Sequence, residues 1–147
     1  MSELRQLVTF RVGRHLLGVD IEEVQEVLTA HDISAVPLAP QEVEGLLNLR
    51  GRIVTAIDLR RRLGLQARSD RQAPMVVVLR PERGSVSLLA DAVGDVVEVG
   101  TEDFEDPPET LRGRSRQLIR GAYKLPRRLL LLLELDRVLD IAVGGQE

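Results

Sequence analysis

The residues that most often carry enzymatic or metal chemistry are scarce in this chain. It has two histidines, His15 and His31, one lysine, Lys124, and no cysteine. Neither histidine has a second metal ligand at a suitable spacing, so both are interpreted as solvated surface residues. The lack of cysteine excludes disulfides, thiolate catalysis and thiolate metal sites. A single lysine without flanking glycines excludes a Gly-x-x-x-x-Gly-Lys phosphate loop.

Two clusters of carboxylates remain as candidates for acid–base or metal chemistry. One contains Glu22, Glu23 and Glu26, and the other lies within residues 102–106. The second cluster lacks the alternating ligand spacing and the central glycine of a calcium loop. Such clusters are commonly solvated faces, and no Gly-x-Ser-x-Gly nucleophile elbow is present. The sequence therefore predicts no catalytic site, no metal and no cofactor, and an enzyme is the least favoured class of function.

Arg50 lies in the one polar pattern that indicates an ordered surface. Asn48 can hydrogen-bond the backbone of a turn, and Gly51 permits an unusual backbone angle. An arginine held on such a turn can pair with a carboxylate, and Glu26 is the expected partner. We expect this pair to form a binding surface rather than a catalytic one. Arg120 also precedes a glycine, but it is interpreted as a turn residue without such a role.

A basic run in the second half of the chain provides an alternative function. Its members are Arg112, Arg114, Arg116, Arg120, Lys124, Arg127 and Arg128. A barrel with a basic face could bind a phosphate backbone. The run lacks the interleaved aromatic residues that stack on bases, and acidic residues directly precede it. A salt-paired loop is therefore favoured, and nucleic acid is not an expected partner.

The composition is typical of a globular protein. Of 147 residues, 44% are apolar and 29% are charged, and the net charge of −3 gives no general attraction to nucleic acid or anionic membranes. The N-terminus has no signal-peptide pattern, and the longest apolar run, residues 129–133, is too short to cross a bilayer. We expect a cytoplasmic protein with one domain or two very small ones.

Alternating apolar and polar residues predict a chain built mainly of short strands. Residues 7–12 and 16–21 form a hairpin around Gly13 and Arg14. Residues 24–28 suit either a continued helix or a strand. Further strands are predicted at residues 52–57, 75–79, 85–90, 93–99 and 129–135.

Four short helical segments are expected between these strands. Asp20 and Glu23 resemble a capping box for one helical turn, and residues 41–46 are a short helix after Pro40. Asp58 is an N-cap for residues 59–63, with Gly64 as the stop. Asp136 is expected to cap a last helix that runs to about residue 143. Residues 68–74 and 100–116 are expected to be loops.

The two halves of the sequence resemble each other. The proposed correspondences, in the same order in both halves, are Asp20–Val27 with Asp91–Val99, Pro37 and Pro40 with Pro107 and Pro108, Leu49-Arg-Gly51 with Ile119-Arg-Gly121, and Ile57-Asp-Leu59 with Leu133-Glu-Leu135. Short strands separated by frequent turns favour small barrels. Each half is near the size at which a lone core is marginal, so we predict two similar β-barrels that share a buried interface.

The order of these motifs resembles the CheW coupling proteins of bacterial chemotaxis, over residues 4–143. The first half carries the more specific pattern, in Val19-Asp-Ile21, Val24, Glu26-Val27, Val36-Pro37, Gly45-Leu-Leu-Asn-Leu-Arg-Gly51 and Ile57-Asp-Leu-Arg60. The second half matches through Leu89-Ala-Asp-Ala-Val93, Val96, Pro107-Pro108, Ile119-Arg-Gly121 and Leu133-Glu-Leu-Asp-Arg137. Thr55, where the family often has proline, and Ala92, where glycine or another small residue is usual, are the departures from the pattern.

The resemblance implies a mainly β fold of two tandem, five-stranded SH3-like barrels with a hydrophobic interface and a C-terminal helix. Residues 4–143 would form one CheW-like domain, with approximate subdomains at 14–74 and at 75–143 plus the strand 4–13. It also implies a non-enzymatic adaptor that links chemoreceptor cytoplasmic tips to the regulatory domain of a CheA histidine kinase. Such a protein is cytoplasmic and recruited to membrane-associated receptor arrays, without inserting into the membrane.

Nine residues match family positions tied to partner binding. They are Val24, Glu26, Val27, Asn48, Arg50, Gly51, Asp91, Ala92 and Val93. The last three match a turn that lines the same groove as the first six. A kinase that controls gliding, pili or development in place of flagella stays an open variant, whereas the start and end of the chain argue against a fragment of a longer kinase.

Overall fold

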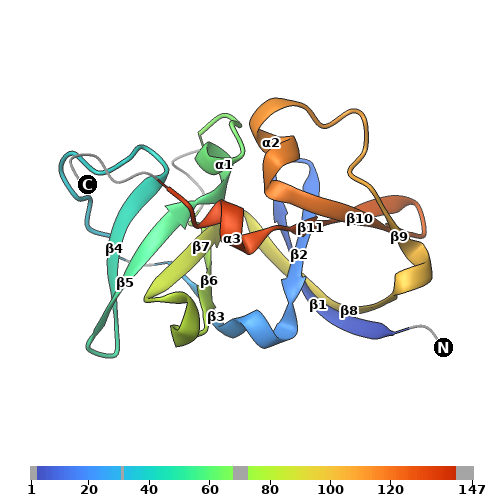
Figure 1. Cartoon of the computed structure of the whole chain (residues 1–147). Helices are drawn as coiled ribbons and strands as arrows, with labels where there is room; N and C mark the ends of the chain where they lie inside the picture. The colour runs from blue at the N-terminus through green and yellow to red at the C-terminus, as the bar shows by residue number, and fades with distance from the viewer. Residues whose placement is uncertain (1–2, 31, 68–72, 142–147) are drawn as a thin grey trace.

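The computed structural model describes residues 3–30, 32–67 and 73–141. Its strands form two sheets, which lie side by side in Figure 1. We call the five-stranded one barrel 1. Its spatial order is β3 (Val24–Thr29), β6 (Met75–Leu79), β7 (Val86–Ala90), β5 (Arg52–Asp58) and β4 (Val43–Leu49). The six-stranded one is barrel 2. Its order is β8 (Ala92–Gly100), β1 (Leu4–Val12), β2 (His15–Asp20), β11 (Arg128–Leu133), β10 (Ile119–Leu125) and β9 (Phe104–Glu105).

The two barrels share one topology, which confirms the predicted duplication. Strands β3-β6-β7-β5-β4 of barrel 1 correspond in order to β8-β1-β2-β11-β10 of barrel 2. The parallel pair falls at the same place in each, between β5 and β7 and between β2 and β11. All other strand pairs described in the two sheets are antiparallel.

One of the four proposed correspondences between the halves is wrong. Leu49-Arg-Gly51 ends β4, whereas Ile119-Arg-Gly121 begins β10. The true counterpart of Gly121 is Gly45, because each glycine follows a register shift at the start of its strand. A Cβ on Gly45 would lie 2.2 Å from the Ser34 carbonyl, and one on Gly121 would lie 2.3 Å from the Phe104 ring. Each barrel therefore needs glycine where the preceding connector crosses its strand.

The sheets also divide the chain differently from the approximate subdomains 14–74 and 75–143 plus 4–13. Strand β2 belongs to barrel 2, although residues 15–20 fell in the first expected subdomain. Strands β6 and β7 belong to barrel 1, although residues 75–90 fell in the second. The reason is hairpin pairing: β1 pairs with β2 and β6 pairs with β7, so each hairpin stays in one sheet.

The predicted strands are largely confirmed, and the helices less so. The expected helix at residues 41–46 is wrong, because β4 pairs with β5 from Val43 onward. A helix within the expected loop 100–116 was missed: α2 covers Gly113–Leu118, and Arg112 before it gives no side-chain cap. Residues 24–28 lie in strand β3. The expected loop 68–74 lies mostly outside the described residues.

Capping aspartates were predicted correctly at two helices and incorrectly at a third. Asp20 accepts a hydrogen bond from the Glu22 backbone at the 3₁₀ turn Ile21–Glu23, and Asp58 accepts one from Arg60 at α1 (Leu59–Arg62). Helix α3 covers Leu135–Val138 and begins after Glu134, so Asp136 lies inside its first turn instead of at its cap. The described chain leaves this helix at Leu139, well before residue 143. Two more 3₁₀ turns cover Pro81–Arg83 and Thr101–Asp103.

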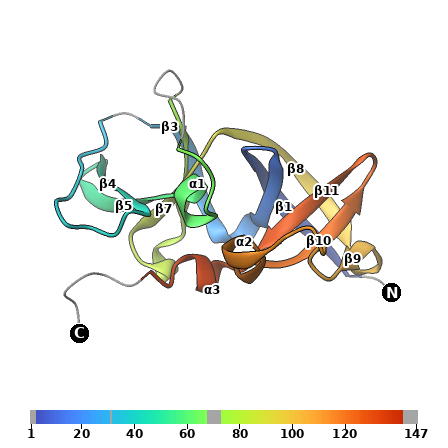
Figure 2. The ribbon, with the colours of Figure 1, turned by 90° about the horizontal axis from the view of Figure 1, so that it is seen from above.

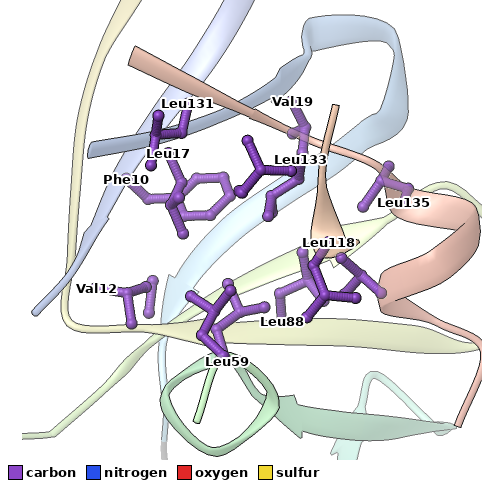
Figure 3. Close-up of a cluster of buried hydrophobic side chains, with 14 of the residues drawn as sticks. Phe10, Val12, Leu17, Val19, Leu59, Leu88, Leu118, Leu131, Leu133 and Leu135 are labelled. Atoms are coloured by element: carbon purple, nitrogen blue, oxygen red, sulfur yellow. The ribbon is translucent and has the colours of Figure 1, made fainter. Parts of the chain in front are cut away.

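A shared apolar core joins the two barrels, as predicted. Figure 3 shows Phe10, Leu17 and Leu131 of barrel 2 together with Leu88 of barrel 1 and with Leu59 of α1. The short helices add Leu118 and Leu135 to the same cluster. The interiors of the barrels hold two smaller clusters, which include Val54 and Val78 in barrel 1 and Leu7 and Leu130 in barrel 2. The interbarrel core thus places the two barrels relative to each other.

Arginines add polar contacts along the seam between the barrels, where all three helices lie (Figure 2). The Arg62 side chain donates to the Val138 and Arg137 carbonyls at 2.8 and 2.6 Å. Arg83 donates to Glu23 at 2.9 Å and also to Asp136. Hydrogen bonds to these two carboxylates raise the pKa of the Arg83 guanidinium. Within the described residues, no helix is long and apolar enough to span a bilayer.

Candidate partner-binding site

The turn between β4 and β5 presents Arg50 at the end of a tight hairpin. Leu49 pairs with Arg52, which leaves Arg50 and Gly51 as a two-residue loop. Both have positive φ, 50° and 86°, as the central residues of a type I′ turn do. The Asn48 side-chain oxygen accepts a hydrogen bond from the Gly51 backbone at 2.8 Å. The predicted role of Asn48 in the turn is therefore confirmed.

The predicted pair of Arg50 and Glu26 is present. The Arg50 guanidinium donates to the Glu26 carboxylate, which comes from β3. The side chains are 69% and 26% exposed, so the arginine reaches outward over a half-buried carboxylate. Beside it, Arg52 donates to the Gln25 side chain at 3.3 Å. The two contacts join the hairpin end to β3, across the opening between the first and last strands of barrel 1.

Three residues of this corner were missed from the sequence: Gln25, Arg52 and Ile53. The Arg52 Nε atom is buried and has no hydrogen-bond partner within the described part of the chain. Ile53 pairs across the strands with Asn48 and is 53% exposed. The register of a two-residue hairpin could have indicated Arg52 and Ile53, because it places them opposite Leu49 and Asn48. We call Gln25, Glu26, Asn48, Arg50, Gly51, Arg52 and Ile53 the hairpin corner.

Val24 and Val27 lie beside the corner, on the face of β3 that turns toward barrel 2. Their partners on β6 are Leu79 and Val77, which are both in the interbarrel core. Residues opposite each other on neighbouring strands share a face of the sheet. Val24 packs against this core, whereas Val27 remains 36% exposed. The two valines therefore form an apolar rim next to Glu26.

The Asp91 side chain forms hydrogen bonds with other residues of this chain. Its carboxylate accepts hydrogen bonds from Arg60 Nε at 2.9 Å, from Arg60 Nη2 at 2.7 Å and from the Gly13 backbone at 2.7 Å. Its side chain is 13% exposed. The hydrogen bond to Asp91 raises the pKa of the Arg60 guanidinium. Asp91 thereby ties the β7–β8 junction to α1 and to the β1–β2 turn.

Ala92 and Val93 begin β8 directly after this contact. They pair with Arg11 and Phe10 of β1, and both line a cavity of about 240 Å³. Val93 packs against the same interbarrel core as Val24. The predicted residues thus fall into two groups, the hairpin corner with its valine rim and the β7–β8 junction, and Val24 and Val93 connect them through the core.

Three members of the basic run of the second half lie near carboxylates of the chain, whereas Arg112, Arg127 and Arg128 have no ion pair with a described residue. Lys124 lies 2.8 Å from Glu105, Arg120 lies 3.8 Å from Glu134, and Arg114 lies 3.9 Å from Glu42. The hydrogen bond that the Lys124 ammonium donates to Glu105 raises the pKa of Lys124. These contacts fit the salt-paired interpretation of the run.

Comparisons with known proteins give one consistent result. The CheW-like domain family model matches residues 6–143. The chain is 31% identical to a chemotaxis protein CheW of Treponema pallidum over 93% of its own length and 83% of the relative. It is 33% identical to the CheW of Rhizobium meliloti over 91% of its length and 86% of that protein.

A solved structure shows the same fold. It is the scaffolding protein TtCheW from Thermoanaerobacter tengcongensis, which superposes with a TM-score of 0.78 at 26% identity, covering 99% of this chain and 97% of the other. Sequence and structure therefore agree over nearly the whole chain, which belongs to the CheW-like family of non-enzymatic chemotaxis scaffold proteins.

Proposed function

We propose that this chain couples chemoreceptors to a CheA-type histidine kinase as an adaptor without catalytic activity. The observation that carries the proposal is the full-length match to the CheW-like family. The hairpin corner agrees with it, since Arg50 is ordered by Glu26 while most of its side chain remains exposed. An ordered, exposed arginine is a common contact in protein interfaces.

The receptor tip is proposed to bind along the valine rim of β3. Val27 follows Glu26 on β3 and Ile53 lies on β5 after the Arg50 turn, and both are exposed apolar side chains. A helical hairpin that presents apolar residues on one face could contact Val27 and Ile53, and a carboxylate at the edge of that face could pair with Arg50.

The kinase regulatory domain is proposed to bind through barrel-to-barrel contacts. A scaffold that holds both partners converts the second binding event into an intramolecular one, which raises the effective concentration of the kinase at the receptor. Asp91 supports this arrangement indirectly, because its contacts with Arg60 and Gly13 connect the barrels. We propose a cytoplasmic location with recruitment to receptor arrays at the membrane, and no insertion into the bilayer.

The test is co-sedimentation of the purified chain with a receptor-tip fragment and with a CheA regulatory domain, each alone and both together. The adaptor is expected to bind each partner and to bring the regulatory domain into the receptor pellet. Circular dichroism on the same sample checks that the chain is folded. Folded protein that binds neither partner would contradict the proposal.

A further inference from the structure

Barrel 2 contains a cavity of about 420 Å³ at the end where β1 turns into β2. Its walls come from the β1–β2 turn, from β11 and from the connector that precedes α2. Small-molecule sites usually have volumes of about 300–1,000 Å³. The cavity is therefore large enough for a compact organic ligand.

The polar part of the wall is mainly basic, with Thr110 as an uncharged member. Arg11, Arg14, His15 and Arg128 contribute to it, and within the described residues no carboxylate lines it. None of the three arginines has an ion pair or a side-chain hydrogen bond with another described residue. Burial and the charge of Arg14 lower the pKa of the His15 imidazole. The three arginines thus place positive charge around the cavity, and no carboxylate of the described residues pairs with them.

In a second arginine-lined cavity, carboxylates of the chain lie close to some of the arginines. It measures about 560 Å³ and includes Arg61, Arg112 and Arg114. Arg61 lies 3.6 Å from Asp58, and Arg114 lies 3.9 Å from Glu42. Two of the three arginines of this cavity therefore already have a carboxylate nearby, so it offers less to an anion than the one in barrel 2.

The rest of the barrel 2 cavity is apolar. Leu111 and Leu131 are buried at its base, and Leu129 is partly exposed at its wall. The smaller cavity beside Ala92 and Val93 shares Arg11 and Arg128 with it and also contains Asp95. The Asp95 carboxylate disfavours an anionic group on that side. A ligand would therefore place its charge between the arginines and its apolar part on the leucines.

We propose that this cavity binds a small organic anion with an apolar body, held by Arg11, Arg14 and Arg128. A guanidinium group donates two parallel hydrogen bonds to a phosphate or carboxylate. His15 adds a donor beside Arg14. The phosphate and carboxylate forms share this chemistry, and direct binding measurements distinguish them. The site lies apart from the hairpin corner and does not depend on the proposed adaptor function.

The test is isothermal titration calorimetry of the full chain with phenyl phosphate, with benzoate and with inorganic phosphate. Phenyl phosphate or benzoate is expected to bind saturably, and phenyl phosphate is expected to bind more tightly than inorganic phosphate because its ring covers the leucines. The stronger of the two organic anions identifies the ligand class. In proton NMR the His15 ring signal is expected to shift on titration, and a His15→Gln variant assigns that signal.

Matched variants locate the site. Arg14→Gln and Arg128→Gln are each expected to weaken binding by roughly tenfold or more, while Arg114→Gln removes the same charge from the other cavity and leaves binding unchanged. Urea denaturation checks that each variant is folded. The proposal is wrong if none of the three anions binds saturably, or if Arg114→Gln weakens binding as much as Arg14→Gln and Arg128→Gln do.

Discussion

The β4–β5 hairpin of barrel 1 and the β10–β11 hairpin of barrel 2 occupy equivalent places but have different turns. Each has a two-residue loop with an arginine at positive φ, Arg50 at 50° and Arg127 at 71°. In barrel 1 the loop is Arg-Gly, and both residues have positive φ. In barrel 2 the loop is Pro126-Arg127, where proline is restricted to negative φ.

The surroundings of the two arginines differ more than their backbones. Arg50 pairs with Glu26 on β3, and Asn48 braces the turn. Arg127 has no ion pair with a described residue. At the place equivalent to Asn48, Lys124 pairs with Glu105. Duplication therefore supplied two similar hairpins, and side chains around only one of them order its arginine. This contrast can be tested with matched substitutions.

The largest effect is expected at the two equivalent aspartates, Asp91 after β7 and Asp20 at the end of β2. Asp91→Ala should lower the free energy of unfolding by about 2 kcal/mol, because it leaves the partly buried Arg60 guanidinium without its carboxylate and removes the acceptor of the exposed Gly13 amide. Asp20→Ala should lower it by only about 1 kcal/mol, since it removes a cap from one 3₁₀ turn and a partly exposed contact with Arg5. Urea denaturation measures both. Equal losses of unfolding free energy in the two variants would contradict the structural role assigned to Asp91.

The next largest effect separates binding from folding. Arg50→Ala should weaken partner binding by roughly tenfold, with less than about 1 kcal/mol lost from stability, because the pair is largely exposed. Arg127→Ala is the matched control and should leave binding unchanged. Co-sedimentation and urea denaturation of both variants provide the measurements. If Arg50→Ala unfolds the chain, its role is structural and the site assignment fails.

Backbone substitutions in the turns should have opposite signs. Gly51→Ala should destabilise the chain by about 1 kcal/mol, because a φ of 86° is unfavourable for alanine. The loss should not be larger, because no neighbouring atom lies within 4 Å of an added Cβ. Arg127→Gly should be neutral or stabilise by less than about 1 kcal/mol, because glycine accepts a positive φ without strain. Thermal and urea unfolding check the signs. A stabilising Gly51→Ala would contradict the turn geometry of barrel 1.

The smallest effect on stability is expected from exchanging the charges of the pair. The double variant Glu26→Arg with Arg50→Glu keeps an exposed ion pair, so its stability should stay within about 0.5 kcal/mol of the parent. Its partner binding should remain weak, because the partner now meets reversed charges. Recovered binding would mean that the pair acts only by ordering the turn, whatever the charge on each side.

Local sequence patterns predicted much of the fold and part of the site. Alternation with the Gly13-Arg14 turn predicted the β1–β2 hairpin, the apolar run at residues 75–79 predicted β6, and Asp58 with Gly64 predicted α1. The expected helix at residues 41–46 failed because pairing of β4 with β5 outweighed local helix preference. The partner of Arg50 was predicted from residue chemistry, while Arg52 and Ile53 required the hairpin register to be known.

The sequence alone determined the strand periodicity, the duplication, the Asn-Leu-Arg-Gly turn and the absence of cysteine chemistry, because each depends on residue type and near neighbours. Tertiary structure decided which hairpin joins which barrel, that Gly121 corresponds to Gly45, and that Asp91 braces the seam beside Arg60. It also brought Arg11, Arg14 and Arg128 around one cavity. These outcomes depend on contacts between residues far apart in the chain, which side-chain burial and strand pairing select only when the whole fold forms.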